Sequence, residues 1–294
     1  MVTRASDVNR MSPLVLACVA ATWVVWGSTY LAIKFALVSF PPFFQMGTRF
    51  LVAGAILLAW TRLQGYPMPT GTQWRNAGVV GALMLGGMGC VAYSELTVAS
   101  GLVVAFIAVT PATIALMNLL FGVRPSRLEV AGMVVGLAGV LLLVRGAGFS
   151  ASPAGLVAVA AGNVTWALGS VLSQRKFVLA DGAVGFASEM LCGGLFLMLV
   201  SFFAGERFHW PPQPLALWSW IYLVFFGSLI AFSAYMVLLA RTRPALAASY
   251  SFVNPVIAML LGVTLGSEVV TSHEWWAVTV IVCGVILLIF GKRQ

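Results

Sequence analysis

The stretch WGSTYLAIKFALVSFPPFFQMGTRF, residues 26–50, contains two apolar runs separated by Pro41-Pro42, and its two charged residues are Lys34 and Arg49. A run of about 20 apolar residues is long enough to cross the hydrocarbon core of a bilayer as a helix. A proline at the first helical position leaves no amide hydrogen unpaired, so the double proline suits a short turn followed by a helix start. The stretch therefore predicts two membrane helices, with Lys34 at the end of the first and Arg49 inside the second.

The whole chain has the same apolar character. It has 294 residues, of which 61% are hydrophobic and 8% are charged, and its mean hydropathy is +1.01. Soluble proteins carry about 25% charged residues, and no soluble fold could hide this much apolar surface. The formal net charge of +8 comes from basic residues scattered between apolar runs. That distribution is typical of membrane flanks and argues against nucleic-acid binding.

We predict ten membrane helices, which makes the chain an all-α integral membrane protein. The connections are short and rich in Pro and Gly, and the alternating segments of about ten residues that build β-barrels are absent from the sequence. The Arg-flanked N-terminal run is long enough to span a bilayer, so we expect a retained first span rather than a signal peptide. The predicted helices are 13–36, 42–61, 75–94, 100–121, 128–145, 154–173, 183–204, 215–239, 245–265 and 274–290.

The basic residues predict the orientation in the membrane. Ten spans put both termini on one side, and twelve basic residues fall on that side against three on the other, namely Lys34, Arg145 and Arg207. The positive-inside rule therefore places both termini in the cytoplasm. The twelve are Arg4, Arg10, Arg62, Arg75, Arg124, Arg127, Arg175, Lys176, Arg241, Arg243, Lys292 and Arg293.

The second half of the sequence repeats the first. RFLVAGAILL (49–58) aligns with EMLCGGLFLM (189–198), and GVLLLVRG (139–146) aligns with GVILLIFG (284–291). With two residues inserted, AYSELTVASGLVVAFIAVTP (92–111) aligns with AYMVLLARTRPALAASYSFVNP (234–255). Since each half holds five spans, the predicted repeats, 1–147 and 148–294, have opposite orientations. Inverted repeats are a recurring construction of secondary transporters that work by alternating access.

The residues WGSTYLAIKFAL followed by PPFFQMGTRFLVAGAILL resemble the opening signature of EamA-type carriers of the drug/metabolite transporter superfamily. The resemblance covers essentially the whole chain. It implies five plus five spans, cytoplasmic ends, and export or exchange of small metabolites across a bacterial cytoplasmic membrane. Bacterial exporters of amino acids, including aromatic ones, lie in this group. The second half departs from the signature, reading WALGSVLSQRKFVLADGAVGFASEM (166–190), and the signature does not specify a substrate.

Aromatic and neutral polar residues inside the spans are the candidates for a substrate cavity. Aromatic faces stack on flat or cationic solutes, and an asparagine amide needs a cavity or a partner helix in hydrocarbon. Interfacial, packing and cross-helix roles are the open alternatives. The predicted cavity residues are Trp26, Tyr30, Tyr93, Thr110, Asn163, Trp166, Tyr250 and Asn254.

Prolines and charges inside the spans complete the candidate set. Pro111 and Pro255 occupy repeat-related positions and serve either as hinges or as static kinks. Arg49 and Glu189 are repeat-related charges inside spans, where an isolated charge is costly. For Arg49 we expect structural anchoring first and a contact to substrate or gate second. Glu189 is the only carboxylate well within a span and so the only candidate for proton coupling, and a direct Arg49–Glu189 ion pair requires both side chains to reach.

The remaining patterns restrict the chemistry. The four cysteines lie in apolar runs without a CxxC pair, and the two histidines are isolated, so we predict no disulfide, metal site or cofactor. No GxxxxGK[ST] occurs, which argues against ATP use, and small-residue spacings such as Gly132-MVV-Gly136 predict close helix packing.

The sequence therefore predicts a secondary transporter that exports amino acids or similar small amphiphilic metabolites, facilitated or proton-coupled, as a monomer or homodimer. Its expected partners are the small-molecule substrate and membrane lipid. A membrane-embedded enzyme would need a nucleophile–base pair or a metal cluster within the spans, and a channel would need a polar stripe along several helices.

Overall fold

The computed structural model describes residues 12–98, 100–143, 145, 151–266 and 271–290. Within these residues all regular secondary structure is helical. The elements are α1 (Pro13–Ala36), α2 (Pro42–Leu63), α3 (Gly71–Ser94), α4 (Ser100–Ile107), α5 (Thr110–Leu119), α6 (Arg127–Leu143), α7 (Pro153–Arg175), α8 (Ala183–Phe203), α9 (Pro214–Tyr222), the π-helix η2 (Leu223–Phe232), α10 (Ser233–Arg241), α11 (Pro244–Ala247), α12 (Tyr250–Gly266) and α13 (Ser272–Phe290).

Local sequence signals mark several helix starts. α2 begins at Pro42, as the double proline predicted, and α1 and α7 also carry a proline in the first turn. The Ser12 side chain accepts a hydrogen bond from Val15 N, and Thr70 forms a capping box with Gln73. This capping box starts α3 at Gly71, four residues before the predicted start of the third span.

Seven helical stretches are long and apolar enough to cross a membrane by length and composition. Each lies at a predicted span, and exposed apolar side chains such as Leu116, Phe202 and Phe203 cover the outer surface. Shorter helices occupy the other three predicted spans: α4 and α5 the fourth, α6 the fifth, and α13 the tenth. The structure therefore confirms an all-helical, multi-span protein, while the number ten stays a prediction. The seven stretches are 13–36, 42–63, 71–94, 153–175, 183–203, 214–241 and 244–261.

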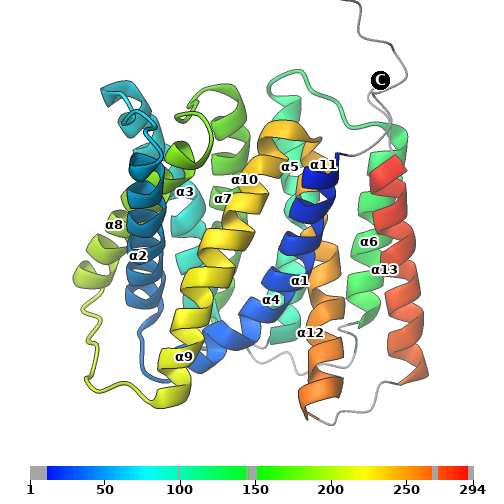
Figure 1. Cartoon of the computed structure of the whole chain (residues 1–294). Helices are drawn as coiled ribbons and strands as arrows, with labels where there is room; N and C mark the ends of the chain where they lie inside the picture. Colours follow the sequence, from blue (N-terminus) through cyan, green and yellow to red (C-terminus); the bar gives the residue numbers. More distant parts are fainter. Residues whose placement is uncertain (1–11, 99, 144, 146–150, 267–270, 291–294) are drawn as a thin grey trace, which may run out of the picture.

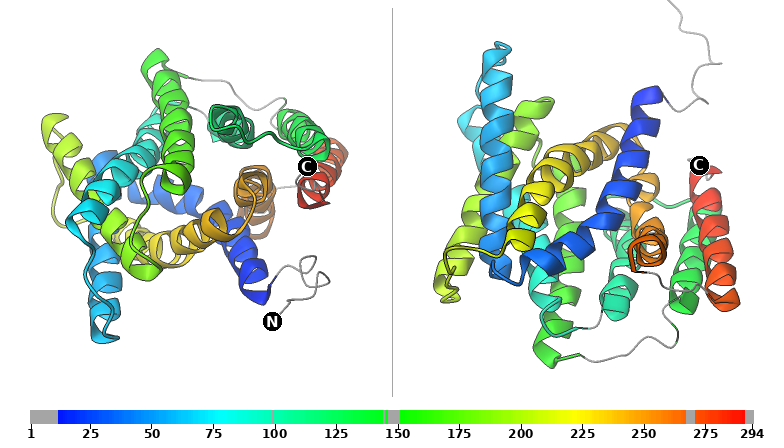
Figure 2. Two further views of the ribbon diagram at one scale, coloured as in Figure 1. Left: turned by 90° about the horizontal axis from the view of Figure 1, so that it is seen from above. Right: turned by 60° about the horizontal axis from the view of Figure 1, so that its bottom comes forward.

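The helices form one bundle in which α1 begins and α13 ends at the same end (Figure 1). We call this end the terminal end and the opposite one the far end. α2 packs against α8, α3 against α7 and α8, and α1 against α12 and the α9–η2–α10 segment. α6 and α13 pack together at one edge of the bundle (Figure 2). Segments from the two halves of the chain thus alternate around the interior.

Bare glycine backbone permits the closest of these contacts. A Cβ on Gly132 would lie 2.8 Å from Gly284 O, and a Cβ on Gly284 would lie 2.5 Å from Gly136 N. The small-residue spacing that predicted close packing therefore sets the contact between α6 and α13.

Two predicted spans are interrupted, the fourth near its middle and the ninth near its start. The fourth breaks at Ala108-Val109, between α4 and α5, directly before Thr110-Pro111. The ninth breaks at Ala248-Ser249, between α11 and α12. Pro255 lies inside the continuous helix α12 rather than at this break. The two prolines that the sequence paired as hinges therefore occupy different surroundings.

The eighth span, Pro214–Arg241, contains a feature that the sequence pattern did not predict. Its central third is the π-helix η2, flanked by α9 and α10. π-helical segments are rare and occur frequently at functional sites.

Candidate substrate cavity and vestibule

A wide cavity of ≈ 2020 Å³ lies at the terminal end of the bundle, and we call it the vestibule. Its wall includes the start of α1 at Ser12 and Val15, the end of α7, the end of α10 and the end of α13 at Phe290. Elements from both halves of the chain therefore build it.

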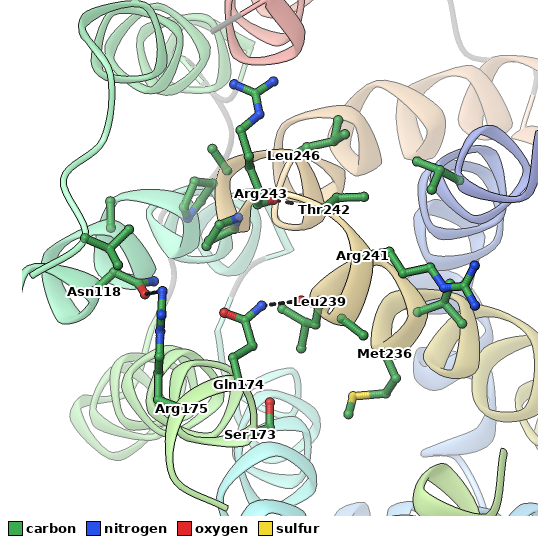
Figure 3. A pocket seen from close by; sticks show the side chains of 18 of the residues that line it. Asn118, Ser173, Gln174, Arg175, Met236, Leu239, Arg241, Thr242, Arg243 and Leu246 are labelled. Atoms are coloured by element: carbon green, nitrogen blue, oxygen red, sulfur yellow. Dashed lines mark hydrogen bonds between the residues drawn. The ribbon is translucent and has the colours of Figure 1, made fainter. Parts of the chain in front are cut away.

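The vestibule carries more positive than negative side chains. Arg124, Arg175, Arg241 and Arg243 line it, against the acids Glu129 and Asp181. Arg243 Nη1 lies 3.2 Å from Glu129 Oε1, and Arg243 Nη2 donates to the Ile289 carbonyl at 2.7 Å. Arg175 reaches Asn118 Oδ1, whereas Arg241 extends toward α1 (Figure 3). Neither Arg124 nor Arg241 makes a hydrogen bond or ion pair with another described residue, so the vestibule favours anions.

A second, much smaller cavity of ≈ 70 Å³ lies deeper in the bundle, and we call it the central cavity. Since a water molecule occupies about 30 Å³ in the liquid, this space suits roughly two waters and is too small for an amino acid. The cavity is lined by Trp26, Thr29, Tyr30, Ile33, Met46, Gly87, Met88, Val91, Ile107, Thr110, Gly162, Asn163, Trp166 and Tyr250.

Four aromatic rings pack together beside the central cavity. The Trp26 ring centroid lies 5.7 Å from that of Trp166, 5.3 Å from Tyr235 and 4.6 Å from Tyr250. Trp26, Trp166 and Tyr250 line the central cavity, while Met236, the neighbour of Tyr235, lines the vestibule. Three of the four rings of this aromatic cluster therefore form part of the wall of the central cavity.

Asn163 joins the cavity wall to the broken fourth span. Its Nδ2 donates to the Phe106 carbonyl at 2.8 Å and to Thr110 Oγ1 at 2.9 Å. The break between α4 and α5 leaves backbone groups without their helical partners, and the Asn163 amide provides a donor for one of them. Asn163 thus has a cross-helix role and also lines the central cavity.

Two predicted cavity residues do not line the central cavity. Asn254, with its amide nitrogen turned toward the carbonyls of Tyr250 (3.0 Å) and Trp23 (3.1 Å), connects α12 to α1. Tyr93 is 37% exposed and stacks on Phe43. Successive residues of an α-helix are rotated by about 100°, so Tyr93 points away from the cavity face of α3 that carries Val91.

The two intramembrane charges are fully buried, and neither lines the vestibule or the central cavity. Arg49 Nε donates to Ser228 Oγ at 3.0 Å, while its two Nη atoms have no hydrogen-bond partner. Both carboxylate oxygens of Glu189 also lack a hydrogen-bond partner. Across the described residues the single salt bridge is Arg243–Glu129, so Arg49 and Glu189 are not paired with each other. In the same part of the chain, no group of three or more His, Cys, Asp or Glu side chains is placed to hold a metal ion.

The chain matches the EamA-like transporter family twice, over residues 11–145 and over residues 153–290. It belongs to this family. The "Uncharacterized inner membrane transporter YedA" of Escherichia coli is 40% identical over 274 residues, covering 92% of this chain and 89% of that protein. "Protein PecM" of Dickeya dadantii is 27% identical and covers 92% of each chain. A solved structure titled "Crystal structure of protein" superposes with a TM-score of 0.76, at 24% identity, over 95% of this chain and 96% of the other, which shows a shared fold.

This EamA-family chain is therefore a membrane transporter, and seven apolar helices fit a multi-pass protein of the bacterial inner membrane. Sequence reasoning missed Tyr235 as a member of the aromatic cluster, although the repeat alignment already pairs Tyr235 with Tyr93. It also missed Gly227 and Ser228 of η2. Gly227 O accepts a hydrogen bond from Trp26 Nε1 at 3.2 Å. A glycine and a serine in an apolar run carried no pattern that could have singled them out.

Proposed function

We propose that this EamA-family chain is a secondary transporter that exports amino acids or similar small amphiphilic metabolites by alternating access. The observation that carries this proposal is the pair of cavities: a wide vestibule at the terminal end and, deeper in the bundle, a small central cavity whose wall includes three rings of the aromatic cluster. In alternating access, a central site of this kind widens toward one side of the membrane at a time.

The helix contacts support a rocking motion between two related halves. With the predicted spans numbered one to ten, the third packs against the sixth, and the first packs against the eighth, which is the corresponding pair. The second packs against the seventh and the fifth against the tenth, and each of these pairs joins equivalent spans. Each of these four contacts is thus mirrored by its counterpart or pairs equivalent spans. Two inverted five-helix repeats explain this reciprocity, and their exchange of conformations would open the central cavity to the far end.

The chemistry of the walls supports an amphiphilic substrate and the direction of transport. Trp26, Tyr30, Trp166 and Tyr250 provide ring faces, and Thr110 provides a polar group. The positive-inside rule predicts cytoplasmic termini, and with that orientation the vestibule faces the side from which an exporter loads. In the coupled version of this proposal, the buried Glu189 carboxylate carries the proton.

The test is transport into proteoliposomes with a panel of amino acids, with and without a pH gradient. We expect saturable flux of at least one of them. Absence of transport of any small solute would contradict the proposed function. The coupled version predicts that Glu189→Gln abolishes the response to the pH gradient, while Asp181→Asn in the loop before α8 keeps it.

A further inference from the structure

The aromatic cluster has buried hydrogen-bond donors on two sides that lack well-aligned acceptors. Trp166 lines the central cavity, and its Nε1 makes no well-aligned hydrogen bond, because the nearby Tyr235 and Tyr250 hydroxyls interact with it only at poor geometry. Arg49 Nη1 and Nη2 lack a hydrogen-bond partner. A buried donor without an acceptor costs about 1–3 kcal/mol, and more when it is charged. The two free Arg49 nitrogens near the cavity wall, with the poorly bonded Trp166 Nε1 in that wall, indicate a site for an acceptor that carries negative charge.

Arg49 lies directly behind the wall of the central cavity. Met46, one turn earlier on α2, lines this cavity, and so does Thr29 of α1. A Cβ on Gly227 would lie 3.1 Å from Arg49 Nη2 and 3.2 Å from Thr29 Cγ2. The guanidinium and the cavity-lining Thr29 methyl therefore approach the same bare backbone position of η2.

One turn of the π-helix holds both the aromatic cluster and the arginine. Gly227 O accepts the Trp26 indole hydrogen, and Ser228 Oγ accepts Arg49 Nε. π-helical turns occur mostly as single-turn irregularities inside α-helices, frequently at functional sites. A shift of the Gly227–Ser228 turn would release Trp26 and Arg49 together, which would bring the free Nη edge to the cavity.

The charge of Arg49 has no counter-ion among the described residues, and the contact of its guanidinium carbon with the Phe50 ring, 4.7 Å from the centroid, offsets only part of the cost of burial. A guanidinium stays protonated in proteins, and a buried ion without a counter-ion is strongly unfavourable. No carboxylate lies within salt-bridge distance of Arg49 in the described part of the chain. The vestibule, with the unpaired Arg124 and Arg241, attracts anions toward the same cluster.

We infer that the free Nη edge of Arg49, together with Trp166 Nε1, binds the carboxylate of the transported solute. This inference rests on the proposed transport function and narrows its substrates to carboxylate-bearing amphiphiles. The planar guanidinium presents two parallel N–H groups that match a carboxylate, which a lysine ammonium does not. If Arg49 served only to anchor η2, the hydrogen bond from its Nε to Ser228 would be sufficient, and transport would not depend on the charge of the solute.

The experiment compares three solutes with the same ring in proteoliposomes: 3-phenylpropionate, L-phenylalanine and phenethylamine. We expect the unsubstituted protein to transport the two carboxylates and to discriminate against the amine. Arg49→Lys should raise KM for the carboxylates about tenfold, equivalent to about 1.4 kcal/mol, and should lower the ratio of carboxylate to amine flux. Trp166→Phe should change the same ratio less. Arg62→Met, on the exposed part of α2, is the control and should leave the ratio unchanged.

The remaining outcomes separate this inference from the proposed function. Ser228→Ala removes the Nε acceptor and keeps the Nη edge, so it should lower the melting temperature without changing the solute preference. If Arg49→Lys lowers flux of all three solutes equally, or if the amine is the preferred solute, the carboxylate site is wrong and the transport function stands. If neither these solutes nor the amino-acid panel is transported, both proposals fail. Arg49→Met extends the series only where size-exclusion chromatography shows a folded protein.

Discussion

The third and eighth spans correspond in the two halves of the sequence, yet they do different things in the structure. α3 is a continuous α-helix, and its Tyr93 lies half-exposed against Phe43. The eighth span contains η2, and its Tyr235, which aligns with Tyr93, is fully buried among Trp26, Trp166 and Tyr250. A π-turn holds more residues than an α-turn, so residues beyond η2 point in a different direction from their counterparts on α3. The π-helix therefore accounts for the position of Tyr235 in the aromatic cluster, whereas Tyr93, which aligns with it on an α-helix, lies outside the cluster.

The largest expected difference between the two spans is the loss of stability when the ring of Tyr235 or of Tyr93 is removed. Tyr235→Ala leaves a cavity between Trp26, Trp166 and Tyr250, and we expect it to lower the free energy of unfolding by about 2–4 kcal/mol. Tyr93→Ala should cost less than about 1 kcal/mol, because the ring is already partly exposed. Thermal unfolding in detergent measures both. Equal losses would mean that the two tyrosines have equivalent surroundings after all.

Added methyl groups come next and test how tightly each span is packed. A Cβ on Gly81 of α3 would lie 2.6 Å from the Glu189 backbone oxygen, which cannot rotate away. We expect Gly81→Ala to cost about 1–3 kcal/mol. Gly227→Ala should cost less, since the Cβ would meet only the side chains of Arg49 and Thr29. Gly78→Ala, with nothing within 4 Å, is the control and should be neutral or stabilising in the same unfolding assay.

The tyrosine hydroxyls provide a smaller test. The Tyr235 hydroxyl lies 2.9 Å from Ser170 Oγ, and both residues are buried. Tyr235→Phe should therefore lower the free energy of unfolding by about 1 kcal/mol, a typical contribution of one hydrogen bond. Tyr93→Phe should change nothing measurable. A melting temperature that Tyr235→Phe leaves unchanged would show that this hydrogen bond does not stabilise the cluster.

The smallest expected effect concerns the arginine that each of the two spans carries near the terminal end of the bundle, Arg241 or Arg75. Arg241 closes α10 in the vestibule, whereas Arg75 lies on the exposed first turns of α3 and does not line it. For a carboxylate solute, Arg241→Gln should raise KM about two- to fivefold at low salt, and the effect should shrink as salt screens the field. Arg75→Gln should leave KM unchanged. A KM increase in Arg241→Gln that is independent of ionic strength would point to direct contact instead of steering.

Much of the fold was predictable because it depends on local chemistry. Pro42 and Thr70 mark helix starts through their own backbone and side-chain bonds, and the seven longest apolar stretches are spans by length alone. The predicted cavity set was less complete. Trp26, Tyr30, Thr110, Asn163, Trp166 and Tyr250 do line the central cavity, since large rings and amides inside spans favour a shared interior. Tyr93 and Asn254 do not, because the direction in which each points depends on the rotation of its helix.

By itself the sequence determined that this chain is an apolar bundle of the EamA family, that Arg49 lies inside a span, and that two halves repeat each other. Each of these follows from residue type and order along the chain. Only the tertiary structure decided that Tyr235 rather than Tyr93 joins the aromatic cluster, that η2 departs from α-helical geometry, and that Gly227 connects Trp26 with Arg49. The physical reason is that helix rotation and backbone hydrogen bonding are settled by contacts between α1, α2 and the eighth span, segments that lie far apart in the sequence.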